Sequence, residues 1–527
     1  MRRPTLLLFT TTSLLFMAGC AAQLTFTPTT PTSPSGNMAP VSLTVTDISP
    51  TGVVVLSFQL SITGASLEPG NISLLSSANP VPVNVSQLQA ESAFVGSANV
   101  TPGTYTSLSL TLSNPQLTIY NSTGSAIGTC ANNTICQLAP ATTPLTLTFA
   151  SAPFPVSLAA NSPLALLLDV NMNTVIQPDL SLNLAATNGV LLSQLPSPPA
   201  GLPTSGLGKL MGTIQSLGVN QFTLQPSYGG TYTVYVNSST TYDIPPTAIC
   251  GGVCNMACQG LGCLIVGDVV MAEVSLQADG NLLASEVDYF ESAGQPTVEG
   301  TIVGVTPWEA GTSIDLILQV VPPNPTSNLL TPGQHASVLV PVSGVSYAVD
   351  WGSFTPPTNF NLGTFQGLLV GQEVRVVVQG SVTTSGSGSS GTPPITPLGP
   401  AAVFFTTNSV MLEPTQITAQ ISNINASVLE FDPSTFSSYF IPAEEAMTSG
   451  TPPILESAAI TVDTTAQTAY EGLSPNNFSG LAVNDVISVE GWLLPYAGPV
   501  PAYVCNGCPL GTTMAAKTVR GRSNQLF

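Results

Sequence analysis

The sequence predicts an all-β protein: an N-terminal β-sandwich followed by three tandem small β-barrel units. Only 6% of its 527 residues are charged and 43% are hydrophobic, with 47 Pro and 46 Gly in the chain. This composition suits short strands joined by turns and offers little to helices. A chain of this length has room for about three to five domains. Alternating apolar residues and internal repeats predict where each domain begins and ends.

The N-terminus carries the pattern of an exported protein. Arg2 and Arg3 precede a short apolar run, and Ala18-Gly19-Cys20 closes it with small residues. A signal peptide cleaved at an Ala-x-Ala site and a transmembrane helix are the alternatives, but the run is shorter than the roughly 20 residues that span a bilayer. The segment resembles the lipobox of bacterial lipoproteins. That resemblance implies a signal peptide at 1–19, lipidation of Cys20 and anchorage in a membrane.

The residues around the anchor refine this expectation. By the same resemblance, Ala21 stands where an inner-membrane retention signal would place Asp, which favours the outer membrane. Residues 20–40 are rich in Thr, Pro and Ser, cannot bury a core and are expected to form a stalk. The folded part is expected to begin at residue 41.

Residues 41–195 are predicted to form the β-sandwich. Val41, Leu43 and Val45 alternate with Ser42, Thr44 and Thr46, which predicts a strand with one buried face. Residues 196–208 form a Pro/Gly-rich linker.

A resemblance supports the sandwich. Val45-Thr46-Asp47, Pro102-Gly103-Thr104-Tyr105 and Leu166-Leu167-Leu168-Asp169 resemble three motifs of an uncharacterised bacterial lipoprotein domain. That family has no assigned activity, so the resemblance implies a fold and a location only.

The remainder repeats itself at 209–293, 297–413 and 415–527. The three units open with Gly212-Thr213-Ile214, Gly300-Thr301-Ile302 and Ala419-Gln420-Ile421. Their order of motifs resembles an uncharacterised OB-like domain of bacterial exported proteins, which implies three barrels in tandem. A Ser/Gly/Pro stretch at 383–400 is interpreted as an insertion in the second unit.

Eight cysteines remain after Cys20. They form local groups, which in an exported protein predict disulfides: Cys130 and Cys136; Cys250, Cys254, Cys258 and Cys263; Cys505 and Cys508. A Cys₄ metal site in the group of four is the alternative, but zinc sites prefer two Cys pairs separated by a longer loop. We therefore predict no metal site, and the pairing within that group stays open.

Two further features are candidate sites. Tyr347, Trp351 and Phe354 could stack on a ligand, although a role in a barrel core is favoured. His335 is the only histidine, and its turn-like context predicts a surface loop.

Charge and composition restrict the function. Seven Lys and Arg face 27 Asp and Glu, giving a formal charge of −20. The chain offers no basic patch, so nucleic acid is not expected as a partner. Scarce His, Lys and Arg disfavour catalysis, which commonly draws on those residues. We expect a membrane-anchored, non-catalytic envelope protein without a cofactor, which binds an envelope polysaccharide or protein or serves a structural role. A carbohydrate-active or other hydrolytic lipoprotein is the alternative.

Overall fold

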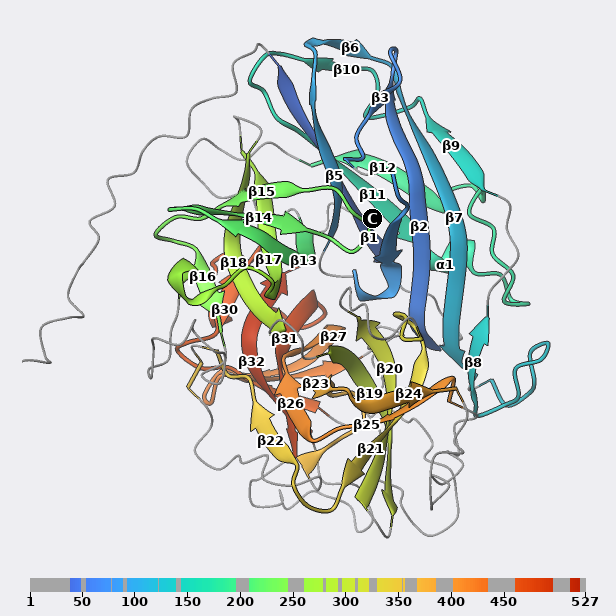
Figure 1. Ribbon diagram of the computed structural model, residues 1–527, viewed down its shortest axis with the longest axis vertical. Coiled ribbons are helices and arrows are strands. Elements are labelled where there is room, and N and C mark those ends of the chain that lie inside the picture. The colour runs from blue at the N-terminus through green and yellow to red at the C-terminus, as the bar shows by residue number, and fades with distance from the viewer. Residues whose placement is uncertain are drawn as a thin grey trace, which may run out of the picture. The chain divides into compact units, whose positions relative to one another are not determined.

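The computed structural model describes residues 38–521 with gaps; the longest of these are 196–207, 245–259, 322–328, 356–366, 385–400, 435–459 and 496–511. Strands dominate the described residues, as the composition predicts (Figure 1). The helical elements among them are α1 (Met172–Val175) and single 3-10 turns such as Leu261–Cys263. No described helix is both long and apolar enough to cross a membrane.

The N-terminal domain, from β1 to β12, is built from two main sheets. The first contains β12 (Val190–Gln194), β11 (Leu164–Asn171), β1 (Ala39–Ile48) and β5 (Ala93–Val100). This sheet continues into the first unit through a short parallel pairing of β5 with β13 (Gly208–Leu217). The second contains β3 (Ile72–Ser73), β2 (Val54–Glu68), β7 (Ser107–Tyr120), β8 (Ile135–Leu138), β4 (Val81–Asn84) and β9 (Leu145–Phe149). A small pair, β6 (Gly103–Tyr105) and β10 (Val156–Leu158), completes it. Apolar side chains from both main sheets form one continuous core.

The first strand differs from its prediction. Val41, Leu43 and Val45 are buried, but so are Ser42 and Thr44 on the opposite face. β1 lies between β11 and β5, so both its edges are paired. The Thr44 hydroxyl donates a hydrogen bond to the Leu166 carbonyl oxygen at 3.3 Å. The second face of β1, which carries Ser and Thr side chains, is therefore covered by other parts of the protein. The alternation of apolar and hydroxyl residues alone cannot distinguish such a face from a solvent-exposed one.

The first unit contains β13 (Gly208–Leu217), β14 (Gln221–Gln225), β15 (Tyr232–Tyr235), β16 (Thr241–Asp243), β17 (Val269–Leu276) and β18 (Leu282–Glu291). Its pairings run β13–β14–β15–β18–β17 and back to β13, with β15 and β18 parallel. β16 adds a short parallel pairing to β18. Apolar residues fill the interior of this closed circuit.

The third unit follows the same path through β27 (Thr415–Asn425), β28 (Glu430–Ser434), β29 (Ile460–Asp463), β30 (Ala469–Glu471), β31 (Val486–Pro495) and β32 (Thr512–Gly521). Its pairings run β27–β28–β29–β32–β31 and back to β27, and β30 pairs β32.

The second unit has the same order with its last strand divided. It contains β19 (Thr297–Trp308), β20 (Gly311–Val320), β21 (His335–Pro341), β22 (Ser346–Val349), β23 (Glu373–Val377), β24 (Gln379–Thr383), β25 (Val403–Thr406) and β26 (Ser409–Glu413). β25 pairs β21 in parallel, while β26 pairs β22 and β23. Only two residues separate β25 from β26 along the chain.

The repeat openings occupy equivalent places in the three units. The third residue of each opening donates its N–H to the carbonyl of a loop residue just before the fourth main strand: Ile214 to Asp268, Ile302 to Gln372 and Ile421 to Asp485, at 2.8, 2.8 and 2.9 Å. At Gly212 and Gly300, a Cβ would lie 2.6 Å from the neighbouring strand's carbonyl oxygen. This close approach explains the glycine in the first two openings.

Candidate functional site: a charged cavity

A cavity of about 310 Å³ lies where the three units and the N-terminal domain meet. Equivalent strands of the three units supply half of its lining residues: β13, β17 and β18 of the first, β19, β23 and β26 of the second, and β27, β31 and β32 of the third. Gln59 of β2 and Pro82 to Asn84 of β4 close it from the N-terminal domain. In each unit, the side of these strands that points away from the unit's own core therefore faces the cavity.

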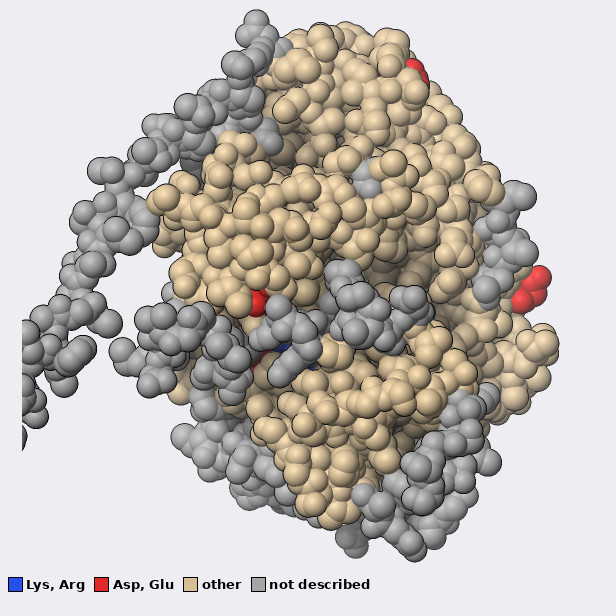
Figure 2. All heavy atoms as spheres, viewed as in Figure 1, with Lys and Arg blue, Asp and Glu red and all other residues tan. Residues whose placement is uncertain are grey.

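Charge is concentrated in this cavity. Its wall contains seven carboxylates and three cations: Asp243, Asp288, Glu299, Asp350, Glu373, Glu413 and Glu490 with Lys209, Arg375 and Lys517. Those three cations come from a chain that has only seven Lys and Arg in total. Figure 2 shows few charged atoms on the described surface of the face it draws. Carboxylates outnumber cations in the wall, which gives it a formal charge of −4 when all are ionised.

Strand register places the acids of the first unit together. In the parallel β16–β18 pair, Asp243 lies opposite Asp288, and Glu286 lies two residues before Asp288 on the same face. The intervening Val287 points the other way and is fully buried in the core of the unit. A period of two therefore sends apolar side chains into the core of the unit and the carboxylates to its outer face, where Asp243 and Asp288 line the cavity.

Arg375 joins two buried glutamates of the second unit. Its Nε lies 3.2 Å from Glu413 Oε1, and its Nη2 lies 3.6 Å from Glu299 Oε2. Nη1 donates to the Tyr289 carbonyl oxygen at 2.9 Å, and the guanidinium stacks 4.8 Å from the Phe290 ring centroid. Burial alone would lower the pKa of Arg375, but the glutamates outweigh it and raise that pKa. Arg375 therefore connects the second unit to β18 of the first.

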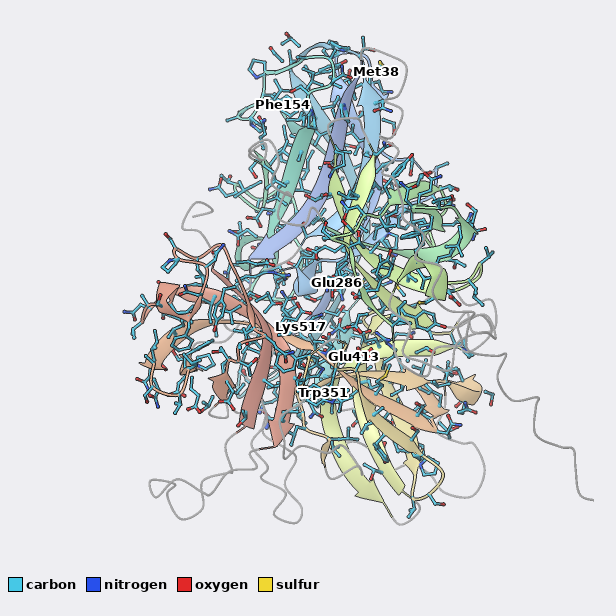
Figure 3. The ribbon with its side chains drawn as sticks, turned by 90° about the vertical axis from the view of Figure 1, so that its left-hand side faces the viewer. Met38, Phe154, Glu286, Trp351, Glu413 and Lys517 are labelled. Carbon is cyan, nitrogen blue, oxygen red and sulfur yellow. A yellow bond between two sulfur atoms is a disulfide. The ribbon has the colours of Figure 1, made fainter. Side chains whose placement is uncertain are left out.

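Lys517 connects the third unit to the first in a similar way. Its Nζ lies 3.3 Å from both Glu286 Oε1 and Glu490 Oε1. Burial raises the pKa of Glu490, but Lys517 and Lys209 outweigh it and bring that pKa to about 2. Figure 3 shows Glu286 and Lys517 close together near the middle of the view, with Glu413 and Trp351 below them. The pair fixes β32 against β18.

Two aspartates of the cavity have raised pKa values. Burial, followed by the nearby Asp350, raises the pKa of Asp243 to about 7. Burial, followed by Glu286, raises the pKa of Asp288 well above its ordinary value even though Lys517 and Lys209 oppose the effect. One carboxylate oxygen from each of Asp243, Glu286 and Asp288 lies within 4.8 Å of the other two. Carboxylates held this close attract protons or cations.

The aromatic residues singled out from the sequence lie in the second unit, on either side of Asp350 in the chain. Trp351 and Phe354 contact Trp492, with ring centroids 4.8 and 5.1 Å away. Trp492 is fully buried, and its Nε1 donates to the carbonyl oxygen of Asp350 at 2.9 Å. Tyr347 is half-buried on β22. Trp351 and Phe354 pack the second unit against the third. Ligand stacking at Tyr347, Trp351 and Phe354 stays a prediction.

The described cysteines agree with an oxidised protein. Cys130 and Cys136 form a disulfide, as predicted. Cys263 lies in the 3-10 turn Leu261–Cys263 and is also disulfide-bonded. The remaining predicted members, Cys250, Cys254, Cys258, Cys505 and Cys508, lie outside the described residues, as do the lipidation site Cys20 and the stalk.

The expectation for His335 was wrong. This residue begins β21 and is only 1% exposed, with Nε2 3.6 Å from Oδ1 of the equally buried Asp315. The β20–β21 register brings Ser337 opposite Asp315, and Ser313 and Ser337 share a hydrogen bond of 2.9 Å. The Pro-Gly turn that suggested a loop ends just before the strand. The turn motif predicted an exposed position for His335, although this residue is part of the sheet.

Sequence reasoning missed most of the cavity. None of the carboxylates in its wall was predicted from the sequence as a site residue, neither Asp350 nor the acids of β18. A usable signal does exist: in a chain with 6% charged residues, Glu286-Val287-Asp288 and Glu373-Val374-Arg375 place charges at alternate positions inside apolar strands. Such placement indicates a strand face that is covered by polar partners.

Two segments of the chain match one family model. Residues 211–288 and 454–495 match a domain of unknown function, DUF5666. The first segment runs from within β13 into β18 and therefore includes Asp243, Glu286 and Asp288. The second covers β29 to β31 of the third unit. A match of one family to both units agrees with their shared order of strand pairings. No curated protein matches the chain.

Proposed function

We propose that this protein is a lipid-anchored, non-catalytic binding protein of the bacterial cell envelope, and that its central cavity takes a positively charged ligand. The observation that carries the proposal is the excess of carboxylates over cations in the cavity wall. Enclosed carboxylates without compensating charge are costly, and a bound cation removes that cost. The protein has few charged residues, and the carboxylates concentrated in this one cavity give it the chemistry of a cation-binding site.

The strand pairings support the finer fold assignment within this proposal. A circuit of five strands, closed by a parallel pairing of the third and fifth, is the arrangement of an OB-like barrel. The two sheets around the N-terminal core fit a β-sandwich. Fold alone assigns no ligand, so the ligand class rests on the cavity.

The anchor part of the proposal rests on the N-terminal pattern. Cys20 would carry the lipid after removal of residues 1–19, and residues 20–40 would hold the folded part off the outer membrane. The Cys20→Ser variant tests this. We expect it to leave the membrane fraction or to accumulate unprocessed, whereas unchanged processing and membrane recovery would refute the anchor.

The cavity part is tested by thermal unfolding of the purified mature protein in detergent with spermidine, Ca²⁺ or Mg²⁺. We expect at least one of these cations to raise the unfolding temperature at constant ionic strength, because a ligand that binds only the folded state stabilises it. Sodium chloride at matched ionic strength is the control for screening. An equal response to the cations and to sodium chloride would refute a cation-binding cavity.

A further inference from the structure

Three carboxylates of the first unit are arranged as ligands of a single ion. Asp243 lies on β16, and Glu286 and Asp288 lie on β18, so the β16–β18 register fixes their spacing. One oxygen from each lies within 4.8 Å of the others. Ion–oxygen distances of about 2.3–2.6 Å place ligand oxygens of one Ca²⁺ at such separations. All three donors are carboxylate oxygens, the type that hard cations prefer.

A second observation, independent of this spacing, concerns individual atoms. The Oδ1 atoms of Asp243 and Asp288 are closed off from solvent and accept no hydrogen bond among the described residues. Both residues line the cavity. Buried carboxylate oxygens are normally satisfied, because leaving one without a partner sacrifices its hydration without replacing it. Two such atoms in one cluster indicate a ligand that supplies positive charge to both.

The resident cations supply only part of that charge. Lys517 holds Glu286 and Glu490, and Arg375 holds Glu299 and Glu413. Lys517 and Lys209 act electrostatically on Asp288, yet its pKa stays raised.

We propose that a Ca²⁺ ion binds to Asp243, Glu286 and Asp288 at the wall of the central cavity, which Asp243 and Asp288 line. The inference rests on the proposed cation-binding function and names its ligand. Lys517 contacts Oε1 of Glu286, so Oε2 can serve the ion, and water completes the six to eight ligands that are typical of Ca²⁺. Mg²⁺ demands a near-ideal octahedron at shorter distances and is usually held by only one or two carboxylates, so a set of three carboxylates favours Ca²⁺.

The test is calorimetric titration of Ca²⁺ into the chelator-treated mature protein at pH 7.5. We expect one Ca²⁺ per chain, with Asp288→Asn weakening it at least tenfold and Asp243→Asn serving as a second variant if the first folds poorly. Asp463→Asn is the matched control, because Asp463 faces Glu430 across β28 and β29 in a separate carboxylate pair. That variant should bind like the wild type.

Each contrary result has a distinct meaning. Ca²⁺ binding that is unchanged in both Asp288→Asn and Asp243→Asn would overturn the site. Spermidine binding without Ca²⁺ binding would overturn the ion while leaving the cation-binding function in place. Failure of spermidine, Ca²⁺ and Mg²⁺ alike would overturn both the inference and the proposed function.

Discussion

The Asp243→Asn variant measures how much the charge of the Asp243 carboxylate destabilises the folded protein, because the substitution removes the charge and leaves the shape of the side chain almost unchanged. Asn keeps the size of the side chain and a polar contact for Asp350, but it cannot ionise. In the folded protein the pKa of Asp243 is raised to about 7, from an ordinary value of 3.8. Between those two pH values the folded chain retains a proton that the unfolded chain has lost. Stability must therefore fall as the pH rises through this window and stay low above it.

The magnitude follows from the width of the window. It spans about 3 pH units, and each is equivalent to about 1.36 kcal/mol, which sets an upper limit of about 4 kcal/mol. Asp243 is half-buried, so screening by solvent reduces this figure, and we expect about 1–2 kcal/mol. The Asn variant should match the wild type near pH 4 and exceed its stability by that amount at pH 8, without metal.

Denaturant unfolding at pH 4, 6 and 8 in the presence of chelator measures this difference. Saturating Ca²⁺ at pH 8 should reverse the order, because the wild type gains binding energy that the variant lacks. A gap between variant and wild type that does not grow from pH 4 to pH 8 would refute the reasoning about Asp243.

Three other substitutions test the packing around the cavity. Arg375→Met should cost about 3–5 kcal/mol in denaturant unfolding, because it leaves two glutamates buried without their cation; Arg520→Met, which breaks a partly exposed pair, should cost less than about 1 kcal/mol. Trp492→Phe should cost at least about 1 kcal/mol, because it removes the hydrogen bond to the Asp350 carbonyl and leaves a void; an equal or greater cost for the half-buried Trp351→Phe would contradict this. Gly300→Ala should lower the unfolding temperature, because its Cβ would lie 2.6 Å from a carbonyl oxygen of β20.

Local pattern was sufficient for the strands and for the repeats. Gly212-Thr213-Ile214 and Gly300-Thr301-Ile302 open equivalent strands because each opening needs the same hydrogen bond and the same close approach. Alternation located β1, but it could not show that Ser42 is covered, since that depends on what packs on the second face. The predicted domain boundaries stay predictions.

The cavity could not be derived from local pattern because its residues come from distant parts of the chain. Asp243, Glu286 and Lys517 become neighbours only when β16, β18 and β32 are assembled. Periodicity places each residue on an outward face, and an outward charge normally indicates solvent. These faces lie against one another because entire units pack together. No single stretch of sequence encodes that packing.

The most direct measurement of the central claim is anomalous diffraction from crystals of the mature protein soaked with Tb³⁺, a Ca²⁺ substitute with a strong anomalous signal. The account predicts a peak between the carboxylates of Asp243, Glu286 and Asp288 that is lost when Ca²⁺ is added in excess. Ordered, empty carboxylates in the cavity, with Tb³⁺ bound only at acids on the outer surface, would contradict it.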